Sequence, residues 1–191
     1  SSSSELSIKI DTIFPSITGV TSTFSDGTYE RGDSIDISVN FSEEVNVSTT
    51  YGTPTLELDL EGPTDRTATY FSGSGSLSII FTYSVEAGDT SSDLDYTSIS
   101  ALSLNGGTIK DFAGNDATLT LASPGAIGSL ASNKALVIDA QLNPTYHIST
   151  SINVPQENHA LTTTVQTSDI SLNTKIYWSL SGTNISLSDF S

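Results

Sequence analysis

The chain has 191 residues, with 22 acidic and six basic side chains and a formal net charge of −16 at pH 7. A surface this negative repels phosphate backbones and anionic lipids, so we expect neither a nucleic-acid partner nor binding to a membrane surface. The chain contains no Cys and no Met, which excludes disulfide bonds and soft metal sites, and it has no run of apolar residues long enough to cross a membrane.

A short segment near the beginning of the chain recurs later. Ile8-Lys9-Ile10-Asp11 is followed by Pro15, and Leu136-Val137-Ile138-Asp139 is followed by Pro144. A strand that closes on an Asp and leads into a Pro-stiffened connector suits the boundary between two β-domains, because Pro fixes φ and cannot donate to a sheet. We therefore expect residues 1–11 to end a preceding module, residues 12–140 to form one domain, and residues 141–191 to begin a second, partial one.

Apolar and polar residues alternate along much of the first domain, which is the pattern of strands with one buried face. The clearest strands are expected at residues 35–41, 56–60 and 77–85, with Glu43 and Glu44 in the loop after the first of these. Their buried positions are Ile35, Ile37, Val39, Phe41, Leu56, Leu58, Leu60, Leu77, Ile79, Phe81, Tyr83 and Val85. Weaker strands are expected at residues 17–24, 67–71, 99–104, 118–121 and 135–138, with no helix beyond a short turn near residues 98–102.

About seven strands separated by Gly-, Asn- and Asp-rich turns predict an all-β fold, an antiparallel immunoglobulin-like β-sandwich. The alternating pattern restarts at residues 146–154, 161–165 and 175–180. Three strands cannot close a sandwich, so this second module is expected to be incomplete. The sequence thus predicts sandwich modules in tandem.

Four pieces of the first domain resemble the immunoglobulin-like repeats of giant bacterial surface proteins. They are residues 32–35 (GDSI), 39–45 (VNFSEEV), 93–96 (DLDY) and 107–115 (GTIKDFAGN). The family includes repeat-rich adhesins exported by type I secretion and the large cell-surface protein needed for swimming in marine cyanobacteria. Residues 175–182 and 188–190 resemble the start of a Calx-beta-like sandwich repeat. The resemblance implies an extracellular, cell-surface stalk or adhesive array, with calcium near the domain junctions and neighbouring repeats as partners.

The residues themselves place acidic side chains at both ends of the predicted sandwich. In an antiparallel sheet Asp11, Glu43 and Glu44 should lie at one end, together with the turn that begins at Asp111. A hard cation such as calcium takes six to eight oxygen ligands, which converging carboxylates supply. The alternative is that these are solvated loop acids and that Asp111 binds its own turn backbone.

The opposite end should collect a second acidic group. Its predicted calcium ligands are Asp89, Asp93, Asp95 and Asp139, with Asp33 nearby. Three of these carboxylates lie within one loop, but its spacing is not that of an EF-hand. The alternative is that these Asp residues form turns while Tyr96 packs inward.

The sequence favours a non-enzymatic protein. His147 and His159 lie in no nucleophile or metal-binding spacing, and Glu43-Glu44 are adjacent residues, which point apart rather than facing one cleft. We therefore expect an extracellular spacer or adhesive stalk stiffened by calcium. Two alternatives remain open, a tail-fibre segment of a marine phage and a carbohydrate-binding module. The latter would use the aromatic side chains of Tyr29, Tyr51, Tyr96, Tyr146, Tyr177 and Trp178, for instance on cell-surface glycans.

Overall fold

The computed structural model describes residues 10–62, 65–142, 144–150, 163–168, 170 and 175–177. The chain divides into two compact units, Ser1–Gln141 and Leu142–Ser191. The division lies one residue beyond the boundary expected from the repeated segment. In the described residues no helix is long and apolar enough to cross a membrane.

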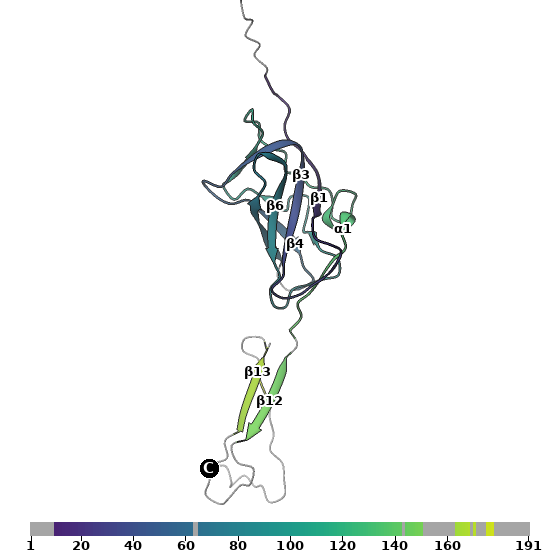
Figure 1. Ribbon diagram of the computed structural model, residues 1–191, viewed down its shortest axis with the longest axis vertical. Coiled ribbons are helices and arrows are strands. Elements are labelled where there is room, and N and C mark those ends of the chain that lie inside the picture. The colour runs from purple at the N-terminus through teal and green to yellow at the C-terminus, as the bar shows by residue number, and fades with distance from the viewer. Residues whose placement is uncertain are drawn as a thin grey trace, which may run out of the picture. The chain divides into compact units, whose positions relative to one another are not determined.

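The first unit is built around a curled antiparallel sheet of eight strands (Figure 1). Six of them form the order β1-β3-β6-β5-β4-β8, while β10 pairs with β3 and β9 pairs with β4. The bounds are β1 (Ile17–Ser22), β3 (Ser34–Ser48), β4 (Thr55–Asp59), β5 (Arg66–Ser72), β6 (Ser76–Ser84), β8 (Asp95–Tyr96), β9 (Leu102–Ser103) and β10 (Thr108–Lys110). The expected all-β class is confirmed.

A second sheet of three strands completes the first unit. It contains β2 (Gly27–Tyr29), β11 (Leu136–Asp139) and β7 (Thr90–Ser91), in the order β2-β11-β7. β11 runs antiparallel to β7 but parallel to β2, so the expectation of a purely antiparallel fold is wrong for this pair. More than one hundred residues separate β2 from β11, and such a long connection allows a parallel pair where a tight hairpin would not.

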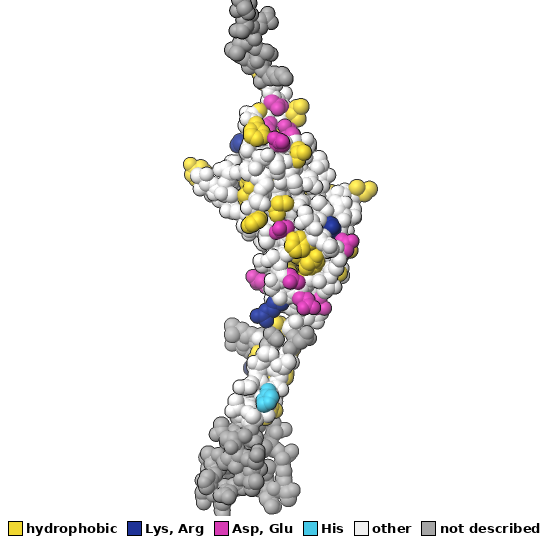
Figure 2. Space-filling model, viewed as in Figure 1, with side chains coloured by type: hydrophobic (Ala, Val, Ile, Leu, Met, Phe, Trp, Pro, Cys, Tyr) yellow, Lys and Arg dark blue, Asp and Glu magenta, His cyan; other side chains and the backbone are white. Residues whose placement is uncertain are grey.

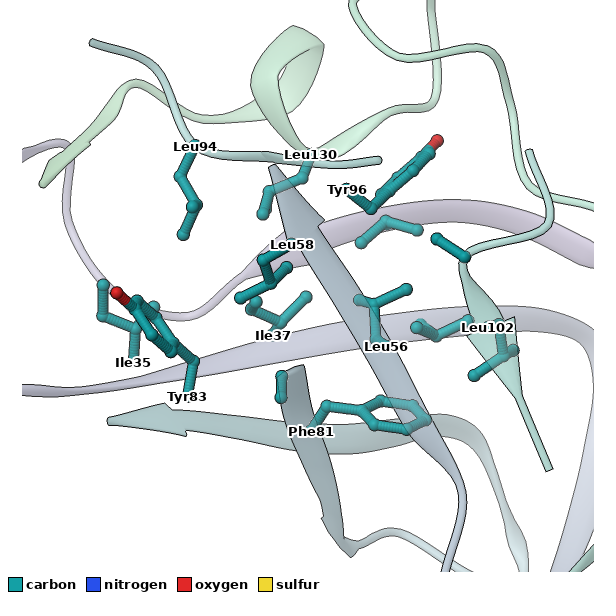
Figure 3. Packing of buried hydrophobic residues seen from close by; sticks show 14 of the residues in the cluster. Ile35, Ile37, Leu56, Leu58, Phe81, Tyr83, Leu94, Tyr96, Leu102 and Leu130 are labelled. Atoms are coloured by element: carbon teal, nitrogen blue, oxygen red, sulfur yellow. The ribbon is translucent and has the colours of Figure 1, made fainter. Parts of the chain in front are cut away.

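The buried faces of these strands form one hydrophobic core (Figure 3). Ile35, Leu58 and Phe81 are completely buried, as their alternation with polar residues predicts. Leu77 is the exception, because it is 54 % exposed. It lies near the start of β6, where the pairing with β3 changes register between Asn40 and Val45, so the expected buried face begins only at Ile79.

A short helix that the sequence pattern does not predict covers part of this core. Helix α1 (Leu130–Asn133) is a single turn, and the side chain of Ser129 caps it by accepting a hydrogen bond from the backbone N of Ser132. Leu130 is fully buried and points from α1 into the core near Tyr96 (Figure 3). One turn offers too few residues for a helical periodicity to be read.

Of the weaker expected strands, residues 67–71 lie within β5 and residues 135–138 lie mostly within β11, whereas the others are shorter than expected. Of residues 99–104 only β9, two residues long, is a strand, and residues 118–121 contribute only an isolated bridge between Thr118 and Ser16. Four further short strands, β2, β7, β8 and β10, lie in stretches where no strand is expected. Strands of two or three residues carry too little alternation to be recognised.

In the second unit the structure describes one antiparallel pair of strands. It pairs β12 (Thr145–Thr150) with β13 (Thr163–Ser168), and Ile148 lies opposite Val165. Residues 175–177, expected to begin a third strand, are not in a strand. The remainder of the strands expected in this unit lies outside the described residues.

Candidate metal centre

Strand β3 is fifteen residues long and pairs with different partners along its length. Its first part lies between β1 and β6, and its last three residues pair with β10. Between these ladders, the six residues of β3 from Asn40 to Val45 lie opposite only the three residues of β6 from Ser78 to Ser76. The strand therefore bulges around Glu43 and Glu44.

The expectation that Glu43 and Glu44 lie in a loop is therefore wrong. The strand does not end at Phe41 because its backbone finds new partners. The amide N of Ser42 donates to the carbonyl O of Ser16 at 2.8 Å, and residues 46–48 pair with β10. Since a backbone with partners on its flanks remains extended, the two glutamates lie within β3.

The pairing of β3 brings two other chain segments to Glu43. β1 is antiparallel to β3, with Ile17 opposite Phe41, so the residues before β1 run toward Glu43. β10 is also antiparallel to β3, with Lys110 opposite Asn46, so Asp111 follows directly beside the bulge. Residues 10–15, which we name the leading segment, thus meet β3 and the end of β10 in one place.

Three carboxylates converge at this meeting point, and we name them the acidic triad. Asp11, Glu43 and Asp111 each offer an oxygen, and these oxygens all lie within 4.8 Å of one another. Asp11 is exposed, Glu43 is half-buried and Asp111 is only 5 % exposed. Acidic side chains gather near both ends of the first unit in Figure 2, and among the described residues only the triad has the grouping that a metal ion requires.

Asp111 is held firmly by the turn that follows it. Its Oδ1 accepts a hydrogen bond from the backbone N of Asn115 at 2.8 Å, and its Oδ2 accepts one from Nδ2 of Asn115 at 2.7 Å. Desolvation alone would raise the pKa of Asp111, but the hydrogen bonds from Asn115 and from the turn backbone lower it below its usual value. Asp111 is therefore a carboxylate that stays charged.

Glu43 is in the opposite situation. Its Oε1 is buried, and no hydrogen-bond partner among the described residues reaches it. Desolvation, followed by the charges of Asp11 and Asp111, raises the pKa of Glu43 above its usual value. A buried carboxylate oxygen without a donor, beside two more carboxylates, is unfavourable unless a cation compensates it.

The triad fits a calcium ion in its chemistry and its spacing. Calcium binds oxygen at about 2.3–2.6 Å, so two oxygens on one ion lie at most about 5 Å apart. The 4.8 Å limit within the triad meets this condition, and the unpartnered Oε1 of Glu43 supplies an acceptor that needs a positive partner. Asp11, Glu43 and Asp111 are thus the residues that would hold the ion. Glu44 is exposed and lies outside the triad.

At the other end of the unit, Asp89 already has a cation from the protein itself. Its Oδ1 accepts a hydrogen bond from Nε of Arg66 at 2.8 Å, and its Oδ2 accepts one from the hydroxyl of Tyr83 at 2.7 Å. Burial, followed by the hydrogen bond to Asp89, raises the pKa of Tyr83, which therefore stays a donor. Asp89 is only 3 % exposed and its oxygens are occupied, so the structure does not support its prediction as a calcium ligand.

The structure does not bring the remaining predicted ligands into such a group. Asp95 is buried, and its two oxygens accept from the backbone N of Tyr96 and of Gly125. Asp93 and Asp139 are exposed, and desolvation together with the nearby charge of Asp95 raises the pKa of Asp93. In the described part of the chain none of these residues belongs to a group of three possible ligands.

The aromatic side chains considered for sugar binding have different environments. Tyr96 is fully buried and donates its hydroxyl to the carbonyl O of Ala122, while Tyr29 is half-buried. Burial, followed by the charge of Asp95, raises the pKa of Tyr96 to about 12.

Other aromatic side chains in this set are exposed. Tyr51 is 88 % exposed and Tyr177 is 86 % exposed. Tyr146 is also exposed, whereas Trp178 and His159 lie outside the described residues.

Two residues that hydrogen-bond to the acidic side chains, Arg66 and Asn115, are not predicted as their partners from the sequence. Arg66 is an isolated basic residue at the start of β5, and nothing in its sequence neighbourhood indicates that it pairs with Asp89, 23 positions away. Asn115 could be recognised only as a turn residue, although it also contacts the leading segment.

Comparisons with models of protein families, with curated proteins and with solved structures found no match.

Proposed function

We propose that this chain is a non-enzymatic repeat module of a large extracellular bacterial surface protein, in which it acts as a calcium-stiffened spacer or adhesive stalk. In this proposal the first unit is an immunoglobulin-like sandwich, and the second begins another sandwich of the array. The partners are neighbouring modules of the same chain. The sequence resemblance and the all-β architecture support this reading.

The observation that carries the proposal is the composition of the acidic triad. Asp11 belongs to the leading segment, whereas Glu43 and Asp111 belong to the body of the sandwich. A calcium ion held by all three would tie the leading segment to the sandwich. When bound, the ion would supply two positive charges that offset most of the negative charge of three neighbouring carboxylates, and it would do no redox or acid–base chemistry.

The chain's own contacts prepare the leading segment for this role. Pro15 is buried, and its carbonyl O accepts from the backbone N of Thr118 at 2.7 Å. Oδ1 of Asp11 accepts from the backbone N of Ile13 at 3.0 Å, which forms a local turn. The segment is therefore already close to the sandwich, and calcium would limit its remaining freedom at Asp11.

Hydrogen exchange on the whole chain tests this proposal. Calcium chloride should slow amide exchange in the leading segment and in the turn at residues 111–115, relative to EDTA. The peptide containing β7, which belongs to the other sheet of the unit, serves as the internal control and should not change. Equal exchange of the leading segment in calcium and in EDTA would overturn the proposal.

A further inference from the structure

Asn115 joins two of the three parts of the acidic triad. Its side-chain Nδ2 donates to Oδ2 of Asp111 at 2.7 Å, to the carbonyl O of Ile13 at 3.2 Å and to the carbonyl O of Asp11 at 3.3 Å. Its backbone N donates to Oδ1 of Asp111 at 2.8 Å. One residue therefore contacts both oxygens of Asp111 and the backbone of the leading segment.

The three acceptors also fix which way the amide of Asn115 points. Only the NH₂ group can face two carbonyls and a carboxylate, because the amide oxygen has no proton to donate. The group has two N–H bonds. The shortest contact takes one of them to Asp111, and the other is shared by the carbonyl oxygens of Asp11 and Ile13. The carboxylate of Asp111 is thus oriented by two bonds from Asn115.

We infer that Asn115 is the positioning residue of the calcium site, and this inference rests on the proposed function. Asn115 holds Asp111 in one orientation and keeps the backbone at Asp11 beside β3, so that both carboxylates meet Glu43. Residues that orient metal ligands in this way typically change metal affinity by about 10–100-fold when they are removed.

The variant Asn115→Asp separates positioning from simple charge. It has nearly the same shape but replaces the NH₂ group by an oxygen, which would face the carboxylate of Asp111 and two carbonyl oxygens. If the site only gathered negative charge, the additional carboxylate would strengthen calcium binding. If Asn115 positions the ligands, the loss of its donor outweighs that charge and binding weakens.

Asn105 provides a matched control. Its Nδ2 also bridges to a distant segment, donating to the carbonyl O of Thr53 at 3.2 Å and to Oγ1 of Thr55 at 2.7 Å. It has no contact with the triad among the interactions described. Asn105→Ala should therefore lower the melting temperature without changing calcium affinity.

The test is calorimetric titration of the whole chain with calcium chloride, at a temperature where circular dichroism shows each variant folded. We expect Asn115→Ala and Asn115→Asp to bind calcium about 10–100-fold more weakly than the wild type, and Asn105→Ala to bind it equally well. If Asn115→Ala does not fold, Asn115→Ser takes its place with the same expectation.

Wild-type affinity in Asn115→Ala, or tighter binding by Asn115→Asp, would overturn the role of Asn115 while leaving the calcium site intact. Weaker binding by Asn105→Ala to the same degree would also overturn it, because the effect would then follow from lost stability. Absence of calcium binding by the wild type would overturn both the inference and the proposed function.

Discussion

The carboxylate of Asp89 accepts a hydrogen bond from the guanidinium of Arg66, with Nε and Oδ1 2.8 Å apart. The hydrogen bond to Asp89 is the main reason why the pKa of Arg66 lies above its usual value. Oδ2 of Asp89 also accepts a hydrogen bond from the backbone N of Glu86 at 2.8 Å. The backbone carbonyl O of Asp89 accepts one from the backbone N of Ala140 at 2.9 Å. Arg66 thus stabilises the place where the first unit ends, with a cation that is part of the chain.

Replacing Arg66 should destabilise the protein strongly. Arg66→Met keeps most of the side-chain volume but leaves the buried carboxylate of Asp89 without its cation. We expect the free energy of unfolding to fall by about 2–3 kcal/mol, somewhat below the value for a fully buried pair, because Arg66 is 30 % exposed. Urea unfolding of the whole chain followed by far-UV circular dichroism measures this loss.

Lys110→Met is the control for this variant. Lys110 forms an ion pair with Asp116 at 2.6 Å, but the two side chains are 37 % and 73 % exposed. Exposed pairs contribute little, so we expect a change within about 0.5 kcal/mol. Equal losses in the two variants would contradict the special role of the Arg66–Asp89 pair.

A second prediction concerns the core and the irregular pairing of β6 with β3 at the start of β6. Leu58 is fully buried and Leu77 is 54 % exposed, although both lie at expected buried positions. Leu58→Ala should lower the free energy of unfolding by about 2–5 kcal/mol, because it leaves a cavity. Leu77→Ala should cost less than about 1 kcal/mol. The same urea experiment compares them, and a large loss for Leu77→Ala would contradict the exposure of Leu77 at the start of β6.

The comparison of Leu58 with Leu77 shows what the sequence can predict. Alternation identifies the long strands and most of the core, since a buried face requires a period of two. It does not show where a strand pairs irregularly. The bulge of β3 depends on partners more than twenty residues away along the chain, so neither the exposure of Leu77 nor the extended conformation at Glu43 can be derived from the local pattern.

For the acidic residues, too, the sequence predicts the general location but not the contacts that depend on distant partners. Strand direction predicts Asp11, Glu43 and Glu44 at one end, together with the turn that begins at Asp111, and the structure brings Asp11, Glu43 and Asp111 together there but leaves Glu44 outside the group. The environment of Asp89 was not expected, because its partners Arg66 and Tyr83 come from two other strands. A run of acids indicates where negative charge gathers, but only the three-dimensional contacts distinguish a carboxylate that already has a cation from one that lacks a partner.

A third prediction is that Glu43→Gln stabilises the calcium-free protein. At neutral pH the substitution removes a charge that is buried beside Asp11 and Asp111. We expect a higher melting temperature than the wild type in EDTA, and no further rise when calcium is added. Glu44→Gln is the control, since Glu44 is the exposed neighbour outside the triad. Identical behaviour of the two variants would contradict the assignment of Glu43.

The effect of Glu43→Gln should depend on pH with a definite sign. The pKa of Glu43 is raised above its usual value of 4.5 in the folded protein. Glu43 therefore contributes most to stability below pH 4.5, and that contribution is lost as the pH rises through the folded pKa. In EDTA the stability difference between Glu43→Gln and the wild type should be largest near neutral pH and should vanish on acidification. A difference that grows toward low pH would contradict the raised pKa.

Calcium bound by Asp11, Glu43 and Asp111 is expected to tie the leading segment to the body of the first unit. The most direct measurement is the melting temperature of the first unit in the whole chain, in EDTA and in excess calcium chloride, for the wild type and for Asp11→Asn. Calcium at about one hundred times its dissociation constant should raise the wild-type value by about 5–10 °C. It should raise that of Asp11→Asn much less. An unchanged melting temperature of the wild type would contradict the account.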